Sequence, residues 1–358
     1  MRHRGVIVGL TLIAALVCVP VKEAVAEQPR VRLITTGGTI SNQPGGRLSA
    51  DELLGSIPDL DGLVEAETEE FANVPSSALT LDQWVWLARR LNEVFQTDPT
   101  LAGIVVTSGT DTLEELAYFL HLTVRHTRPV VVVGAMRRPG ALGYDGAANL
   151  RQALRVAGDA GSHGRGVLVV FNDEINSARE VTKTDALHLQ AFQSRNYGVL
   201  GLADRDGVIY YRRLERRHTA TTEFDIEQIS HLPRVDIVMA YQGASGDLIR
   251  AAVDRGADGI VIAGAGAGAT SARQRDAIAY ASDQGVAVVM TSRTGGGRIA
   301  PQRVSTEPGD DPATSAESQR SGRIYGEDLA PVKARVLLML ALTVSDDHAA
   351  IQRMFSEY

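Results

Sequence analysis

Cysteine, aromatic residues and excess positive charge are all scarce in this sequence of 358 residues. The single cysteine, Cys18, lies near the N-terminus, and Phe, Trp and Tyr together make up 5% of the chain. A fold built after residue 26 therefore has no disulfide, and its stability has to come from a hydrophobic core, which a chain of this length can form. The net charge of −7 is unfavourable for binding nucleic acid or an anionic membrane, so we expect neither partner.

Only one long apolar stretch is present, at residues 6–19. Arg2 and Arg4 precede it and Ala24-Val25-Ala26 follows it, an order typical of a cleavable signal peptide. The stretch is shorter than the ~20 apolar residues that span a bilayer. We therefore expect residues 1–26 to be removed, which leaves a periplasmic or secreted protein with a net charge of −9, no membrane segment and no lipid anchor.

Short runs rich in Val and Ile alternate with segments of helical spacing. The runs lie at residues 31–35, 103–107, 130–134, 166–171, 235–240, 259–263 and 286–290. The clearest apolar stripe of a helix comprises Leu113, Leu116, Ala117, Leu120 and Val124. Such alternation predicts parallel sheets that are covered by helices on both faces.

A polar, charged stretch interrupts this alternation at residues 211–233. We therefore expect an α/β protein of two domains joined by a linker at residues 213–233. The larger N-terminal domain, a doubly wound and mainly parallel sheet, is expected at residues 27–212. The smaller C-terminal parallel α/β domain is expected at residues 234–358.

Two threonines follow two of the apolar runs directly. Thr39 stands in Thr-Gly-Gly-Thr-Ile (residues 36–40), and Thr110 stands before Asp111 in Thr-Ser-Gly-Thr-Asp-Thr (residues 107–112). Ligands of open α/β sheets bind beyond the carboxyl ends of the strands, so these groups are expected at one site. A hydroxyl nucleophile needs a base beside it, and Lys183 is the candidate, because a lysine withdrawn from water can accept a proton.

Each motif also has a simpler interpretation. Gly37-Gly38 suits an ordinary strand-to-loop turn, Asp111 and Glu114 have the spacing of a capping box, and a lone lysine in a polar stretch is normally solvated. Residues 264–269 match a dinucleotide-binding fingerprint loosely, but the next run ends without an acidic residue to hold a ribose. We expect no cofactor and no metal, since the sequence has no phosphate-binding loop and no zinc-binding His pair.

The two threonine motifs have further companions along the chain. They are residues 133–137 (Val-Gly-Ala-Met-Arg), Asp145-Gly146, Asn149-Leu150, residues 181–184 (Val-Thr-Lys-Thr) and residues 333–343. Together these resemble the bacterial type II L-asparaginase/glutaminase-asparaginase family over essentially the whole mature chain. The resemblance implies hydrolysis of L-asparagine, with L-glutamine as a second candidate substrate, by a homotetramer of intimate dimers that needs no cofactor.

The resemblance also implies a role for each site residue. Thr39 attacks the amide carbon to form an acyl-enzyme, while Thr110, Asp111 and Lys183 form the proton relay. Asp111 also holds the substrate's α-ammonium group. The expected substrate-binding residues are Ser76, which holds the α-carboxylate, Ser77, Gly38 and Gly109. The spacing by itself leaves open which threonine attacks first.

Several positions depart from the family pattern. Ser77 stands where many members have a substrate-binding glutamine, and the lid at residues 41–54 lacks the family's tyrosine. Gly243 replaces the asparagine that a neighbouring subunit contributes, and that subunit's glutamate has no clear counterpart in residues 294–304. Two alternatives therefore stay open. One is an amidase with a different preferred amide, and the other is a non-catalytic periplasmic amino-acid-binding protein.

Overall fold

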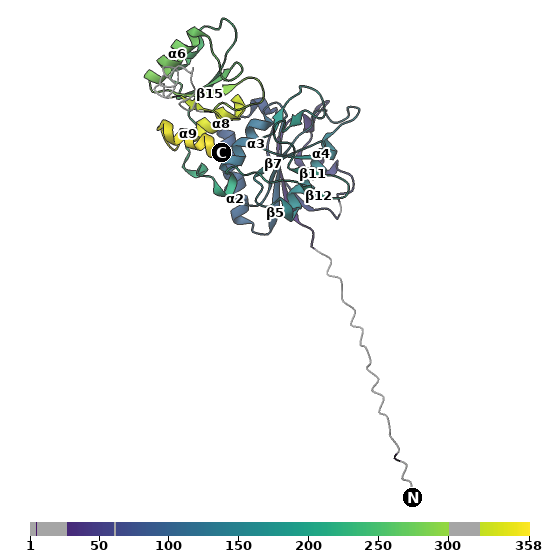
Figure 1. Cartoon of the computed structure of the whole chain (residues 1–358). Coiled ribbons are helices and arrows are strands. Elements are labelled where there is room, and N and C mark those ends of the chain that lie inside the picture. The colour runs from purple at the N-terminus through teal and green to yellow at the C-terminus, as the bar shows by residue number, and fades with distance from the viewer. Residues whose placement is uncertain (1–4, 6–26, 61, 301–322) are drawn as a thin grey trace.

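The computed structural model describes residues 5, 27–60, 62–300 and 323–358, so the expected signal peptide, apart from residue 5, lies outside the described part of the chain. Two α/β domains lie side by side, each around its own sheet (Figure 1). The larger sheet has eight strands in the order β12-β11-β8-β7-β6-β5-β1-β4, of which β7, β6, β5, β1 and β4 are parallel. Its mainly parallel character confirms the expected fold class.

The bounds of the larger domain's elements follow the chain. Its large-sheet strands are β1 Arg30–Gly37, β4 Glu65–Val74, β5 Leu101–Thr107, β6 Val130–Val133, β7 Val167–Phe171, β8 Glu174–Ser177, β11 Gly201–Ala203 and β12 Val208–Tyr210. Two short hairpins pair β2 Asn42–Gln43 with β3 Gly46–Arg47 and β9 Thr182–Lys183 with β10 Phe192–Gln193. The helices are α1 Ala50–Gly55, α2 Leu81–Thr97, α3 Leu113–Thr123 and α4 Gly146–Gly158.

Alternate residues of the central strands supply two separate cores. On β5, Ile104 and Val106 face the core that contains α2 and α3, whereas Val105 faces the core that contains α4. Because the strand is buried on both faces, its sequence is a continuous apolar run and not an alternating one. Helices therefore cover both faces of the sheet, which is the doubly wound arrangement that the sequence predicts.

The smaller sheet is entirely parallel, in the order β13-β14-β15-β16. Its elements are β13 Val235–Met239, α5 Asp247–Asp254, β14 Gly259–Gly264, α6 Ala272–Asp283, β15 Ala287–Ser292, β16 Ile324–Tyr325, α8 Pro331–Ala341 and α9 His348–Glu357. Leu337 of α8 and Leu116 of α3 belong to one continuous core. The two domains are therefore packed together through α3 and α8, as Figure 1 also shows.

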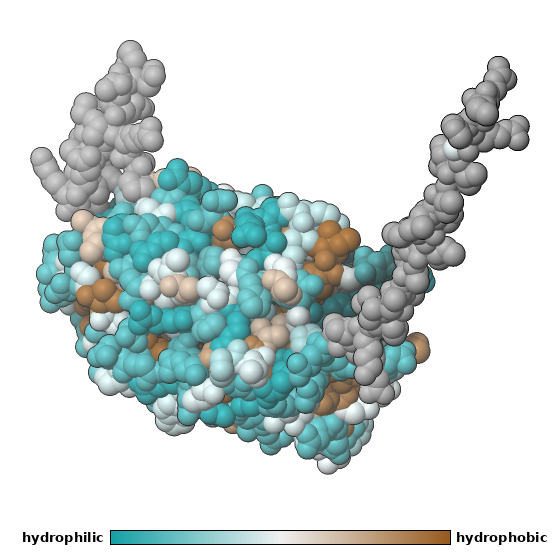
Figure 2. All heavy atoms as spheres, turned by 90° about the horizontal axis from the view of Figure 1, so that it is seen from below, coloured by the Kyte–Doolittle hydropathy of each residue, from teal (hydrophilic) through white to brown (hydrophobic). Residues whose placement is uncertain are grey.

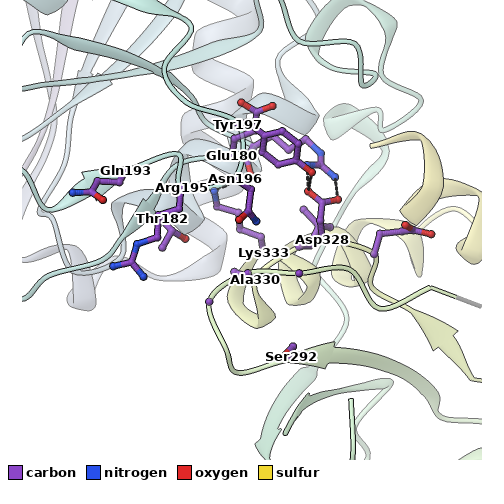
Figure 3. A pocket seen from close by; sticks show the side chains of 16 residues that line it. Glu180, Thr182, Gln193, Arg195, Asn196, Tyr197, Ser292, Asp328, Ala330 and Lys333 are labelled. Atoms are coloured by element: carbon purple, nitrogen blue, oxygen red, sulfur yellow. Dashed lines mark hydrogen bonds and ion pairs between the residues drawn. The ribbon is translucent and has the colours of Figure 1, made fainter. Parts of the chain in front are cut away.

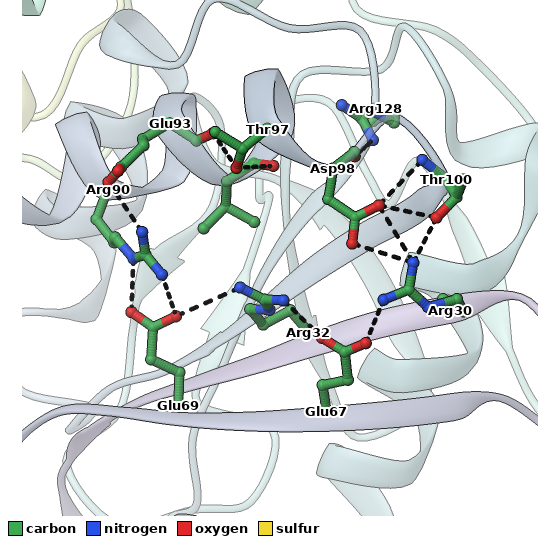
Figure 4. A network of polar contacts seen from close by, with 11 residues as sticks. Arg30, Arg32, Glu67, Glu69, Arg90, Glu93, Thr97, Asp98, Thr100 and Arg128 are labelled. Atoms are coloured by element: carbon green, nitrogen blue, oxygen red, sulfur yellow. Dashed lines mark hydrogen bonds and ion pairs between the residues drawn. The ribbon is translucent and has the colours of Figure 1, made fainter.

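The edge strand β4 is acidic, and arginines of neighbouring elements neutralise it (Figure 4). Arg32 lies opposite Glu67 in the β1–β4 register and is ion-paired with it, and Arg30 also contacts Glu67. Arg90 of α2 binds both oxygens of Glu69, at 2.8 and 3.1 Å. A charged edge of this kind discourages pairing with strands of other molecules.

The described surface is predominantly hydrophilic on the face in Figure 2, where apolar side chains form small separate patches. Among the described residues, none of the helices has the length and apolarity required to cross a bilayer.

Candidate active site

Three of the predicted site residues follow three adjacent strands. Thr39 begins the short 3-10 helix η1 (Thr39–Ser41) after β1, Ser76 begins η2 (Ser76–Ala78) after β4, and Thr110 follows β5. Strand β1 lies between β4 and β5 and is parallel to both. The structure therefore places these residues at one edge of the sheet, beyond the carboxyl ends of the strands, where ligands of such sheets bind.

Glycines allow the turns to touch. Gly38, with φ at +94°, lies so close to the next turn that an added Cβ would be 2.5 Å from the Cα of Gly109. An added Cβ on Gly109 would in turn be 2.9 Å from the Oγ of Ser76. The turns that carry Thr39, Thr110 and Ser76 are therefore in direct backbone contact, which side chains at the two glycines would prevent.

Lys183 reaches this cluster from the short strand β9. Its Nζ donates to the Oγ1 of Thr110 at 3.0 Å and to the Oδ1 of Asp111 at 2.8 Å. The Lys183 side chain is 16% exposed and that of Asp111 is 78% exposed, so the pair faces from the protein interior toward solvent. The half-buried Thr39 has no side-chain hydrogen-bond partner within the described residues, which leaves its hydroxyl available to a ligand.

Glu114 is a site residue that the sequence misassigns. The spacing suggests a capping box with Asp111, yet α3 begins after Thr112, which makes no side-chain cap bond. Instead the Oε2 of Glu114 accepts the Thr182 hydroxyl at 2.5 Å and its Oε1 accepts the Lys183 amide N–H at 3.1 Å. Its function is therefore to hold β9, and with it Lys183, against the start of α3. No local signal reveals this contact, because it joins residues 68 or more positions apart.

The C-terminal domain fixes the segment that leads into β9. The buried Nζ of Lys333 on α8 donates to the carbonyls of Ala178 and Arg179, at 2.9 and 3.0 Å, and to that of Val181. Burial lowers the pKa of Lys333 to about 8. Arg179 binds both carboxylate oxygens of Asp328 at 2.8 Å. Lys183 is therefore held from one side by Glu114 and from the other by this contact between the domains.

A small cavity of about 50 Å³ lies at the same contact (Figure 3). Thr182, Tyr197 and Lys333 line it together with Asp328, whose carboxylate accepts the Tyr197 hydroxyl at 2.7 Å. Neither threonine of the site belongs to the described lining of this cavity. The cavity is therefore beside the candidate site and not part of it.

The other residues and segments that the sequence singles out lie mainly in turns and loops. Ser77 is exposed on η2, and Gly243 is exposed with φ at +74° in the loop after β13. In the loop after β14, an added Cβ on Gly264 would be 2.6 Å from the Cα of Gly268, so small residues there serve the closure of the loop. The predicted lid contains the β2–β3 hairpin. Of residues 294–304, which show no clear counterpart of the neighbouring subunit's glutamate, residues 301–304 lie outside the described part of the chain.

Comparison with known proteins places this geometry in a family. Residues 30–216 match the family model of the asparaginase N-terminal domain, and residues 234–355 match that of the glutaminase/asparaginase C-terminal domain. L-asparaginase 2 of Bacillus subtilis is 38% identical over 340 residues, which cover 92% of this chain and 87% of that protein.

Two further proteins extend the comparison. A glutaminase-asparaginase of Pseudomonas fluorescens is 34% identical over 338 residues, which cover 92% of this chain and 90% of that protein. The crystal structure of a probable cytoplasmic L-asparaginase from Campylobacter jejuni superimposes with a TM-score of 0.85 at 38% identity, covering 92% of this chain and 100% of that one. Matches to both domain models, with identities of 34% and 38% over most of the chain, show that it belongs to the asparaginase family.

Proposed function

We propose that this protein hydrolyses the side-chain amide of L-asparagine to aspartate and ammonia, with L-glutamine as a second substrate. The observation that carries the proposal is the hydrogen-bonded group of Thr110, Lys183 and Asp111 beside Thr39, whose hydroxyl has no partner among the described residues. Relatives named as L-asparaginase and glutaminase-asparaginase support the assignment of substrate class.

The reaction proceeds through a threonine ester. The Oγ1 of Thr39 attacks the amide carbon, its proton passes to the amide nitrogen, and the C–N bond breaks to release ammonia. Water then attacks the ester carbon, which releases aspartate and returns a proton to Thr39. The Nζ of Lys183 and the Oγ1 of Thr110, which are 3.0 Å apart, supply the path along which the proton moves.

Substrate binding uses the rest of the cluster. The exposed carboxylate of Asp111 holds the α-ammonium group, and Ser76, which is only 5% exposed, holds the α-carboxylate. Gly38, Gly109 and Ser77 shape the remaining surface. An exposed ion pair contributes about 0–1 kcal/mol, and one shielded from water by the bound substrate about 1.5–3 kcal/mol, so simple amides without an α-ammonium group should bind more weakly.

A second candidate function is hydrolysis of a different amide by the same machinery. Two features favour it, since the lid at residues 41–54 contains no tyrosine and the loop after β13 has Gly243 where the family pattern has asparagine. Rates on L-asparagine, L-glutamine, their D-isomers and small peptides would rank these substrates. A preference for L-asparagine by orders of magnitude would eliminate this alternative.

Replacement of the nucleophile tests the mechanism. We expect Thr39→Ala to lower ammonia release from L-asparagine by about four to six orders of magnitude, because loss of a covalent nucleophile can cost about 10⁶ in kcat. Isothermal titration should still detect binding of L-asparagine. Thr97→Ala, an exposed threonine at the end of α2, is the control and should keep wild-type activity.

Ammonia release by the wild type separates an enzyme from a binding protein. An amino-acid receptor has no use for a hydroxyl beside a Lys–Thr pair, so a wild type that binds asparagine and releases no ammonia from any amide would overturn the proposal. Hydrolysis by Thr39→Ala at the wild-type rate would refute Thr39 as the nucleophile and leave Thr110 as the candidate.

We also propose export and assembly as a homotetramer, with the domain boundary at residues 213–233. Export is supported by the order of charges and apolar residues in the first 26 positions. Assembly is supported by the exposed apolar side chains of Ile237, Met239 and Leu248 on β13 and α5. Mass spectrometry of the secreted protein should find an N-terminus at Glu27, and light scattering should give the mass of four chains.

A further inference from the structure

The turn that carries Thr39 is held by two side chains, one on each side of the threonine. The carbonyl of Gly38, just before it, accepts the Nη1 of Arg47 at 2.9 Å, and the carbonyl of Ile40, just after it, accepts the hydroxyl of Tyr144 at 2.9 Å. Both carbonyls belong to buried residues, so each needs a partner inside the protein. The Gly38 carbonyl also accepts the backbone N–H of Ser41 at 3.3 Å and the Ser41 hydroxyl at 3.2 Å, within the same turn. Arg47 and Tyr144 are the partners that come from outside the turn.

Tyr144 comes from the loop between β6 and α4 of the larger domain. Asp145 beside it accepts the backbone N–H groups of Met136 and Arg137, each at 2.9 Å, which fixes the loop between β6 and α4. An added Cβ on Gly146 would collide with the Tyr144 ring, so the glycine makes room for the phenol. Burial raises the pKa of Tyr144 to about 12, and the hydroxyl therefore keeps its proton and remains a donor at neutral pH.

Arg47 comes from the lid instead. It is the last residue of β3, and the β2–β3 hairpin begins directly after η1. Its bond to the carbonyl of Gly38 therefore ties the short lid back onto the turn of Thr39. One partner is fixed to the domain and the other belongs to the lid.

We propose that Tyr144 and Arg47 are positioning residues, which set the direction of the Thr39 hydroxyl by clamping the carbonyls on either side of it. The proposal rests on the role of Thr39 as nucleophile and goes beyond it. It also assigns to Tyr144, which lies 105 residues beyond Thr39 in the sequence, a part in a site whose lid has no tyrosine. A shift of about 1 Å in a reacting group can cost about a hundredfold in rate.

Tyr144→Phe tests the clamp, because it removes only the hydroxyl. We expect kcat for L-asparagine to fall about tenfold while KM changes less than about threefold. Tyr210→Phe is the matched control, since Tyr210 is also half-buried, burial raises its pKa to about 12 as well, and its hydroxyl bonds to Ser162 at 2.6 Å on the far edge strand β12. The control should lose similar thermal stability and keep its kcat.

Arg47 provides the second arm of the experiment. Arg47→Met should lower kcat in the same manner as Tyr144→Phe, and Arg47→Lys, which retains a donor, should recover part of the loss. A kcat of Tyr144→Phe within twofold of the wild type, or an equal loss in Tyr210→Phe, would overturn the clamp.

Thr39→Ala, measured in parallel, separates this proposal from the proposed function. If Thr39→Ala is inactive and Tyr144→Phe is unimpaired, only the clamp is wrong. If Thr39→Ala remains active, the nucleophile assignment is wrong and the clamp fails with it.

Discussion

At the scale of single residues, the candidate site depends on one lysine with two partners of different character. Thr110 is 6% exposed and lies 3.0 Å from the Lys183 Nζ, whereas the Asp111 carboxylate, 2.8 Å from the same atom, is largely exposed. The buried partner is suited to pass a proton, and the exposed one is suited to meet a charged substrate. This division explains how adjacent residues of one turn serve two tasks.

Replacement of the lysine tests this division. We expect Lys183→Met to lower kcat about 10²- to 10⁴-fold, the usual contribution of a group that transfers protons, with a much smaller change in KM. Thr110→Val should behave alike, and the double variant should be little worse than either, because residues that act as a unit are not additive. Steady-state kinetics measures kcat for all three variants. If the loss of kcat in the double variant equals the product of the two single losses, the two residues do not share a proton path.

At the scale of elements, α3 and β9 form a unit through Glu114. The carboxylate receives the Thr182 hydroxyl and the Lys183 amide, so both of its oxygens accept donors from β9. A glutamine side chain at position 114 would present its NH₂ group, which is a donor, to either the Thr182 hydroxyl or the Lys183 N–H. The position of Lys183 therefore depends on the ionised carboxylate and not only on the space it fills.

Glu114→Gln is expected to cost about 1–3 kcal/mol of stability and to lower kcat about tenfold, since a lost hydrogen bond to a charged group has this size and Lys183 moves with β9. Glu115→Gln is the control on the same helix. Its carboxylate is 3.8 Å from Arg335, and burial raises its pKa, so its neutralisation should leave kcat unchanged. Equal kcat values for the two variants would show that Glu114 does not position the lysine.

The elements also show what can be predicted from the sequence and what cannot. Strands such as β5 and β14 are buried on both faces, so their sequences are apolar runs that are easy to recognise. The edge strand β4 is missed, because it carries four glutamates and no apolar run. Threonines that follow apolar runs predict residues at the carboxyl edge of the sheet. Hydrogen bonds such as that of the Tyr144 hydroxyl to the Ile40 carbonyl join distant positions, so no local sequence pattern predicts them.

At the scale of the whole molecule, the site depends on the contact between the two domains. Burial would raise the pKa of Asp328, but its hydrogen bonds and charge interaction with Arg179 outweigh this and hold the pKa well below its usual range. The Nε of Arg179 also donates to the main-chain oxygen of Tyr358 at 2.6 Å. The C-terminal helices are therefore anchored to the segment that precedes Lys183, so separation of the domains would also disturb the site.

Stability of the whole chain should depend on pH through a buried histidine. His121 of α3 is fully buried, and its Nδ1 accepts the Val167 N–H at 3.1 Å. Burial, reinforced by nearby His218, lowers the pKa of His121 well below its ordinary value. Above about pH 6.5 the residue is neutral in both the folded and the unfolded chain, and its titration has no effect on stability.

Below about pH 6.5 the unfolded chain binds a proton at His121 that the folded chain does not, so the free energy of unfolding falls as the pH falls, by up to about 1.4 kcal/mol per pH unit from this group. His121→Gln, which keeps an acceptor, should reduce that slope in urea denaturation measured between pH 7 and 5. Exposed His163→Gln should retain the wild-type slope. If the slopes of the two variants are the same, His121 is not the group that makes the fold sensitive to acid.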